Sequence, residues 1–180
     1  MIYITRHGQT DWNVQKRIMG KIDEPLNKTG IEQANITKDN LTGIDIDLII
    51  CSPLLRAKQT AQIINEVLKA DIIYDERISE RSFGEFEGME TKNFDFLGFW
   101  DYYKNDKFAK AENIQDFFQR IYSFLDDITK KYYNKNIMLV AHGGVSIPVD
   151  CYFNKNIPEG SLMEVKPLLN NCEVRTYDLN

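Results

Sequence analysis

Short, almost continuous apolar runs are the feature of this sequence that most restricts its fold. They read IYIT at 2–5, IDLIICS at 46–52 and NIMLVAH at 136–142, with a shorter one, DIIYDERI, at 71–78. Runs of this kind are typical of strands in a parallel sheet that helices cover on both faces. We therefore expect these four runs to be central strands. A fifth run, NCEVRTYDL at 171–179, alternates apolar and polar residues as a half-exposed edge strand does.

Segments with helical periodicity lie between these runs, at 31–41, 54–69 and 114–133. Each follows residues typical of a helix start: a capping box of Thr29 and Glu32, an N-cap at Ser52 before Pro53, and an N-cap at Asn113. Strands that alternate with helices imply crossover connections and a mainly parallel sheet. We expect an α/β fold, a three-layer α/β/α sandwich with a mainly parallel central sheet, in one domain over residues 1–180.

One stretch departs from this alternation. Residues 83–108 hold nine aromatic side chains in 26 positions with little periodicity. We interpret about 83–112 as an aromatic-rich insert on the substrate side of the domain. Phe86, Phe99 and Trp100 are candidate substrate contacts in it, although a small hydrophobic core within the insert explains most of the rings equally well.

The charge balance narrows the classes of partner. The chain has 22 Lys and Arg against 27 Asp and Glu, a formal net charge of −5, so it lacks the basic excess that nucleic-acid binding requires. A small anion remains a candidate partner, because a few cations in a cleft can attract it. A predicted strand begins at residue 2 and no apolar stretch is long enough to span a bilayer, so we expect a cytoplasmic protein without membrane contact.

The cysteines also fit the expectation of a cytoplasmic protein. The three cysteines, Cys51, Cys151 and Cys172, have neither an even count nor metal-like spacing. We expect them to be reduced core residues.

Polar side chains follow the predicted parallel strands at their carboxyl ends, where α/β folds bind ligands. The chain has only two histidines, His7 and His142, and each ends a strand and precedes glycine. Arg6, Arg56 and Glu80 follow strands as well. Two arginines and two imidazoles describe a pocket for a tetrahedral dianion such as phosphate. A neutral histidine there can attack phosphorus, and a glutamate can carry the proton of the leaving oxygen.

Other chemistries lack their motifs in this sequence. There is no P-loop, no dinucleotide fingerprint and no G-x-S-x-G nucleophile motif. No H-E-x-x-H or clustered metal ligands occur either, so we expect neither a metal nor a cofactor.

Five ordered motifs carry a family resemblance over nearly the whole chain: RHGQTDWN, GKIDEPLNKTGIEQA, SPLLRAKQTA, ERSFGEFEG and VAHGGV. Together they resemble the histidine phosphatase superfamily, the phosphoglycerate mutase-like group, and its phosphatase branch in particular. The resemblance implies a phosphohistidine intermediate. It implies three kinds of site residue: catalytic His7, Glu80 and His142; phosphate-binding Arg6, Asn13 and Arg56; and candidate substrate contacts Gln9 and Gly143. For Glu87 it suggests a brace for the loop, and we interpret Ser52 first as a helix cap.

The superfamily holds both phosphatases and mutases. Its mutases carry a W-R-R triplet in the insert, where this chain has Trp100-Asp101-Tyr102, and a G-W-x-D segment, where it has Gly20-Lys21-Ile22-Asp23. Without those arginines a phosphoglycerate carboxylate fits less well. We therefore expect a metal-independent phosphomonoester hydrolase of the histidine acid type, acting on a small phosphorylated metabolite. A phosphoglycerate mutase and a non-catalytic phosphate-binding module remain the alternatives.

Overall fold

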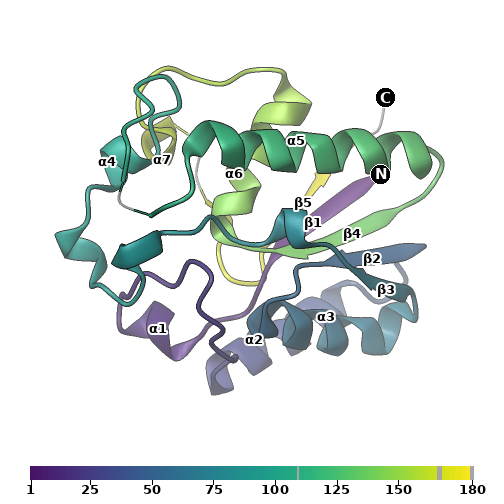
Figure 1. Ribbon diagram of the computed structural model, residues 1–180. Coiled ribbons are helices and arrows are strands. Elements are labelled where there is room, and N and C mark those ends of the chain that lie inside the picture. Colours follow the sequence, from purple (N-terminus) through teal and green to yellow (C-terminus); the bar gives the residue numbers. More distant parts are fainter. Residues whose placement is uncertain (109, 166–167, 179–180) are drawn as a thin grey trace.

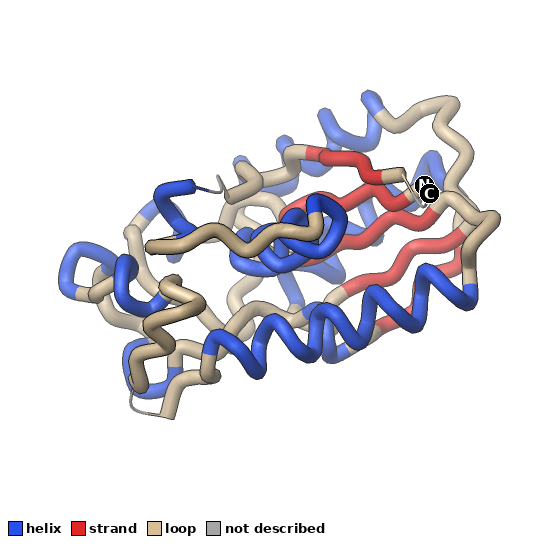
Figure 2. Tube along the Cα trace, turned by 90° about the horizontal axis from the view of Figure 1, so that it is seen from above, coloured by secondary structure: helices blue, strands red, loops and turns tan. Residues whose placement is uncertain are grey.

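A five-stranded sheet forms the centre of the molecule (Figure 1), in a computed structural model that describes residues 1–108, 110–165 and 168–178. The strands are β1 (Ile2–Arg6), β2 (Leu48–Cys51), β3 (Asp71–Tyr74), β4 (Ile137–Ala141) and β5 (Val174–Tyr177). Their spatial order is β3-β2-β4-β1-β5. The first four are parallel to their neighbours and β5 runs antiparallel to β1. The described ends of the chain lie close together (Figure 2).

Helices cover both faces of this sheet. In Figure 1, α5 (Ile114–Lys131) and α6 (Gly143–Asn154) lie on one face, and α2 (Lys28–Asn40) and α3 (Leu55–Leu68) lie on the other. The predicted three-layer α/β/α sandwich is confirmed.

The strand sequences explain the two layers of core. Every residue of β2 and β4 is buried, and neighbouring residues point to opposite faces. Leu48, Ile50 and Leu139 join the core under α5 and α6. Their neighbours join the core under α3, which consists of Leu41, Ile46, Ile49, Cys51, Ala57, Ala61, Ile64, Met138 and Val140. All three cysteines are buried, which agrees with their prediction as core residues.

The prediction of four central strands was wrong for the third. β3 is an edge strand, mostly exposed, and it ends at Tyr74 instead of continuing to 78. Asp75 stops it, because its side chain accepts a hydrogen bond from the Arg77 amide and caps the short helix η1 (Glu76–Ile78). β5 is the edge strand predicted within 171–179, and residue 179 lies outside the described residues.

Two predicted helix starts were wrong and one is confirmed. Asn27, not Thr29, caps α2 by accepting a hydrogen bond from the Gly30 amide. Helix α3 has Leu54 at its N-cap and no side-chain cap, so Ser52 does not start it. Asn113 caps α5 as predicted, because its side chain accepts hydrogen bonds from the amides of residues 115 and 116.

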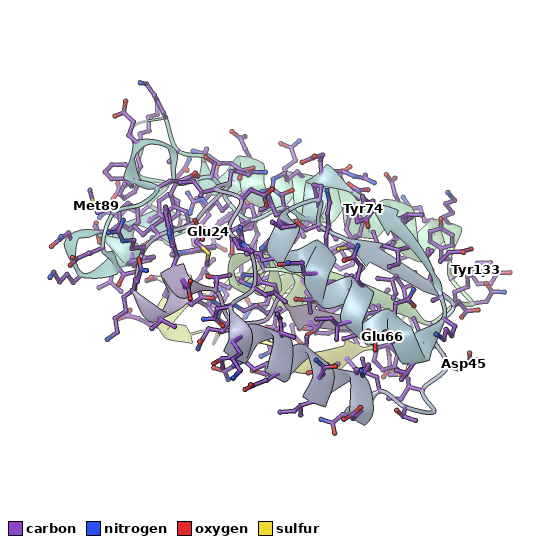
Figure 3. All side chains as sticks on the ribbon, turned by 90° about the horizontal axis from the view of Figure 1, so that it is seen from below. Glu24, Asp45, Glu66, Tyr74, Met89 and Tyr133 are labelled. Carbon is purple, nitrogen blue, oxygen red and sulfur yellow. The ribbon has the colours of Figure 1, made fainter. Side chains whose placement is uncertain are left out.

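The aromatic stretch folds as short turns around its own rings. It contains η2 (Gly84–Phe86), η3 (Thr91–Asn93) and α4 (Phe96–Phe99). Met89 in this stretch and Glu24 lie toward one end of the molecule, and Asp45 and Tyr133, which precede strands, lie toward the other (Figure 3). The stretch therefore extends from the end at which the parallel strands finish.

Over the described ranges, no helix combines the length and the apolar character that crossing a membrane requires. Even α5, with 18 residues, presents one apolar side to the core and a charged side outward.

Candidate functional site

The carboxyl ends of the parallel strands bring most of the predicted site residues together. Arg6 is the last residue of β1 with His7 next, Arg56 lies in the first turn of α3, and His142 directly follows β4. The ring centroids of the two histidines are 5.3 Å apart. A pocket of about 350 Å³ opens here, and five of its lining residues were predicted: Arg6, His7, Asn13, Arg56 and Glu80.

His7 is held with a defined tautomer. Its Nδ1 lies 2.7 Å from the carbonyl oxygen of Gly8. A carbonyl only accepts hydrogen bonds, so Nδ1 carries the proton and a neutral ring keeps a free electron pair on Nε2. Arg56 Nε donates to that Nε2 at 3.2 Å. The ring therefore presents a nucleophilic nitrogen toward a guanidinium group.

Burial keeps this ring neutral. The His7 side chain is almost inaccessible to solvent. Burial, followed by the positive charges of Arg56 and Arg6, lowers the pKa of His7 well below its ordinary value, and the bond to Gly8 opposes this only in part. A neutral imidazole near pH 7 is the form that can attack phosphorus.

Arg56 is locked by neutral acceptors. Besides His7, its guanidinium donates to the carbonyl oxygens of Ile22 at 2.6 Å and Gly20 at 2.8 Å. The residue is fully buried, and burial lowers its pKa to about 10 although the carboxylate of Glu80 raises it. A buried cation held only by neutral groups favours an anion beside it.

Arg6 adds a second positive charge, which is partly buried. Its Nη1 donates to the carbonyl oxygen of Leu169 at 3.0 Å, while its Nε is buried and has no hydrogen-bond partner within the described part of the chain. Burial is the largest cause of its lowered pKa. Phosphate oxygens would satisfy such a donor.

His142, which follows β4, is hydrogen-bonded to Ser52, which follows the neighbouring strand β2. Its Nε2 lies 2.7 Å from Ser52 Oγ, and both side chains are fully buried. Its Nδ1 has no partner in the ranges that the structure describes. Burial first, then the charge of Arg56, lowers the pKa of His142 well below its ordinary value. His142 does not line the pocket surface itself; it lies directly behind it, next to His7.

Glu80 is held by backbone amides. Its Oε1 accepts from the Arg81 amide at 2.8 Å and its Oε2 from the Gly144 amide at 3.0 Å. Gly144 has to be glycine in this arrangement, because a Cβ there would meet Glu80 Oε1 and the ring of Trp100. The carboxylate therefore reaches the pocket in a fixed position beside the start of α6.

Asn13 lies in the short helix α1 (Asp11–Val14). Its Oδ1 accepts from the amide of Thr10, and the Thr10 hydroxyl accepts from the Asn13 amide, which completes a capping box. The capping bond uses the oxygen of the amide group, and Asn13 still lines the pocket. Asn13 therefore combines a structural role with a place in the site.

Two of the predicted substrate contacts are directed elsewhere. Gln9 Oε1 accepts from Asn27 Nδ2 at 3.1 Å, at the start of α2, and Gln9 is not among the lining residues. Gly143 does not line the pocket either; it allows close approach of Arg6, whose guanidinium carbon lies 3.4 Å from where a Cβ would stand. The amide of Leu55, at the start of α3, is taken by Asp23 and is not offered to a ligand.

Sequence reasoning missed several residues that support the site. Ser52 was interpreted as a helix cap, and Thr60, which accepts from the Gly8 amide, was not singled out. Asn171 donates to the His7 carbonyl oxygen at 2.9 Å from the far end of the chain. Of these three residues, only Thr60 could have been found from the sequence, because it lies one helical turn after Arg56. Glu87 braces the loop as expected, because its Oε1 accepts from the amides of Lys21 and Phe83.

The predicted aromatic contacts need correction. Phe99 and Trp100 are buried in the core, and Phe86 packs against it without lining the pocket. Phe83 and Phe96 line the pocket instead.

The charges of the site suit a tetrahedral anion. The buried guanidinium of Arg56 and the partly buried one of Arg6 line one end of the pocket together with the neutral ring of His7. The neutral ring of His142 lies behind them, and the Glu80 carboxylate stands beside them. Among the described residues no three His, Cys, Asp or Glu side chains are grouped so that they could hold a metal ion. The arrangement can bind a phosphoryl group, attack it and move a proton.

Comparisons with known proteins agree with this geometry. The family model of the histidine phosphatase superfamily (branch 1) matches residues 2–179. The uncharacterized phosphatase PhoE of Bacillus subtilis is 37% identical, over 99% of this chain and 94% of its own. The probable phosphoglycerate mutase GpmB of Enterobacter sp. is 30% identical, over 98% and 84%. The structure of Bacillus stearothermophilus YhfR is similar with a TM-score of 0.84 and 28% identity, over 95% and 86%. Since the match extends over nearly every residue, the chain belongs to the histidine phosphatase superfamily.

Proposed function

We propose that the protein is a phosphomonoester hydrolase that works through a phosphohistidine on His7. The observation that carries this proposal is the buried, neutral His7 ring, whose Nε2 faces Arg56 while Nδ1 donates to Gly8. A histidine buried for structural reasons alone would not need two guanidinium groups beside it. The similarity to a relative named as a phosphatase supports the same activity.

The reaction takes two displacements. His7 Nε2 attacks phosphorus, the bond from phosphorus to the ester oxygen breaks, and Glu80 gives a proton to the leaving alcohol. Water then attacks the phosphohistidine, Glu80 takes its proton, and the bond from nitrogen to phosphorus breaks to release phosphate. Arg6, Asn13 and Arg56 would bind the phosphoryl oxygens, and His142 would stabilise the charge that develops on them.

A mutase is less well supported by the insert. Asp101, at the position where the mutases carry an arginine, accepts hydrogen bonds from the amides of Tyr103 and Lys104. The neighbouring Trp100 is buried. Residues 83–108 contain no arginine that could bind a substrate carboxylate. Phosphate release, not transfer back to substrate, is therefore the expected outcome.

The acid-type character belongs to this proposal. Because burial and two arginines lower the pKa of His7, the nucleophile stays neutral as the pH falls below 7. This favours activity in mildly acidic solution. The cytoplasmic location and the absence of metal and cofactor stay predictions from the sequence.

Hydrolysis of an aryl phosphate in the presence of EDTA tests the proposal. We expect phosphate release that the chelator does not reduce, and a loss of about 10³-fold or more in His7→Ala. Gln9→Ala is the matched control, because Gln9 lies two residues away yet is bonded to Asn27 outside the pocket. Full activity in His7→Ala would refute the covalent mechanism.

Two other outcomes would select the alternatives. If 3-phosphoglycerate is isomerised faster than phosphate is released, the protein is a mutase. If a broad panel of phosphoesters binds without turnover, the site is a non-catalytic phosphate-binding module.

A further inference from the structure

The pocket changes character away from the phosphate end. Beyond the five polar residues already described, most of its lining is apolar. The apolar lining residues are Ile18, Met19, Phe83, Phe96, Met163 and Leu168. A substrate whose phosphoryl group lies against His7 would place its alcohol part among these side chains.

Three separate segments build this apolar wall. Ile18 and Met19 follow α1, Phe83 and Phe96 come from the aromatic stretch, and the third part lies at and after α7 (Leu162–Val165). Ile18, Met19 and Phe83 are at most 9% exposed, and all three line the pocket. Surfaces far apart in the sequence therefore converge on one apolar chamber.

A packed cluster of rings supports the wall. Phe83 stacks on Phe99 with centroids 4.4 Å apart and an interplanar angle of 27°. Phe96 meets the edges of Phe94 at 4.9 Å and Phe83 at 6.1 Å. Because neighbouring rings fix each of these side chains, the chamber is formed before a ligand arrives and costs little ordering on binding.

Charged groups in the chamber are few. Arg6 and Arg56 face the phosphate end, and among the described residues Arg17 is the one further cation that lines the pocket. Arg17 is an exposed residue, and its guanidinium lies 5.7 Å from the centroid of the Trp12 ring. A carboxylate on the alcohol part would enter a chamber lined mainly by isoleucine, methionine, phenylalanine and leucine side chains. Burying a charge there without a partner is unfavourable.

We infer that this site takes phosphomonoesters with an apolar alcohol part, such as an aryl or a medium alkyl group, in preference to small carboxylate-bearing esters. The inference rests on the proposed phosphatase activity and names its substrate class. It also assigns a role to the insert, whose Phe83 and Phe96 select the substrate and take no part in the chemistry.

A series of alkyl esters tests the inference, because their leaving alcohols have similar acidity. We expect kcat/KM for n-hexyl phosphate to exceed that for ethyl phosphate at least about tenfold, since each buried methylene contributes to binding. We expect 3-phosphoglycerate to be no better than ethyl phosphate. Equal values for the hexyl and ethyl esters, or a preference for 3-phosphoglycerate, would overturn the inference.

Phosphonates separate this inference from the proposed function. Hexylphosphonate cannot be hydrolysed, so its binding reports on the chamber even if no ester is turned over. We expect its dissociation constant to be at least about tenfold lower than that of ethylphosphonate. Hydrolysis of all the esters with equal affinity for the two phosphonates would refute the chamber and leave the phosphatase intact. Selective binding without any turnover would refute the phosphatase alone.

Two neighbouring variants localise the effect. Phe96→Ser should lower kcat/KM for hexyl phosphate about five- to tenfold and leave ethyl phosphate within about twofold. Leu97→Ser is the matched control in the same helix, because Leu97 is 54% exposed and does not line the pocket. If Phe96→Ser does not fold, Met163→Gln provides the same test from helix α7, which also lines the pocket. Equal losses for both esters would contradict a role in selection.

Discussion

Replacing Ser52 with alanine distinguishes two roles for this residue. The sequence suggested a helix cap, whereas the structure pairs the Ser52 hydroxyl with His142 Nε2 at 2.7 Å. A weaker contact of 3.4 Å with the Leu54 amide is what remains of the cap. If the pairing with His142 matters, Ser52→Ala should impair the reaction; if only the cap matters, it should impair stability alone.

The structure sets the size of the expected effects. Both side chains of the pair are fully buried, so removing the hydroxyl leaves a ring nitrogen without a partner. That costs about 1–3 kcal/mol of the free energy of unfolding. For a chain of this size the Tm should fall by roughly 2 to 12 °C. If the same free energy is lost in the transition state, kcat/KM falls about 5- to 150-fold.

Steady-state hydrolysis of an aryl phosphate and thermal denaturation measure the two effects separately. Ser52→Thr keeps a hydroxyl and should restore most of the activity. Thr37→Val is the control, because it removes a buried hydroxyl that donates to the Cys172 carbonyl oxygen at 3.0 Å, on helix α2. It should lower the Tm and leave kcat/KM unchanged. The reasoning is refuted if Ser52→Ala loses stability but keeps kcat/KM within about twofold.

Three further predictions concern Glu80, the histidines and Gly144. Glu80→Gln should slow hydrolysis of alkyl phosphates at least about tenfold more than that of p-nitrophenyl phosphate, which needs little protonation; equal losses would exclude a proton-transfer role. Burial lowers the pKa values of both histidines, so below about pH 6.5 these two side chains take up protons in the unfolded chain and not in the folded one. The free energy of unfolding, measured in urea, should therefore decrease as the pH is lowered, by up to about 1.4 kcal/mol per pH unit for each histidine. A His7→Gln, His142→Gln double variant should lack this slope. Gly144→Ala, normally favourable in a helix, should lower kcat/KM at least about tenfold because the new Cβ displaces Glu80, and unchanged kinetics would show that Glu80 tolerates the shift.

The sequence predicted the central layers of the fold well because burial leaves a direct signal. β2 and β4 are apolar at every position and lie in the middle of the sheet. β3 was misjudged because IIY is apolar as well, although its side chains are mostly exposed at the sheet edge. Helix α6 was not predicted at all. It begins with two glycines, contains Pro148 and is buried almost all round, so it has neither a helical stripe nor high helix propensity.

For the site, strand ends located the chemistry but not the supporting contacts. Arg6, His7 and His142 follow directly from the rule that parallel sheets bind ligands at their carboxyl ends. The bond between Ser52 and His142 joins two neighbouring strands across 90 residues of sequence, and no local pattern reports it. The apolar chamber was equally hidden, because Met163 and Leu168 reach it only through the tertiary fold.

Trapping the phosphoenzyme tests the central claim most directly. The protein is mixed with a radiolabelled aryl phosphate, quenched within milliseconds, and digested so that the two histidines fall in different peptides. We predict one acid-labile, base-stable phosphoryl group per chain, attached to His7 and absent from His7→Ala. Label on His142, an acid-stable phosphoester, or turnover in His7→Ala at the rate of the unmodified protein would contradict the account.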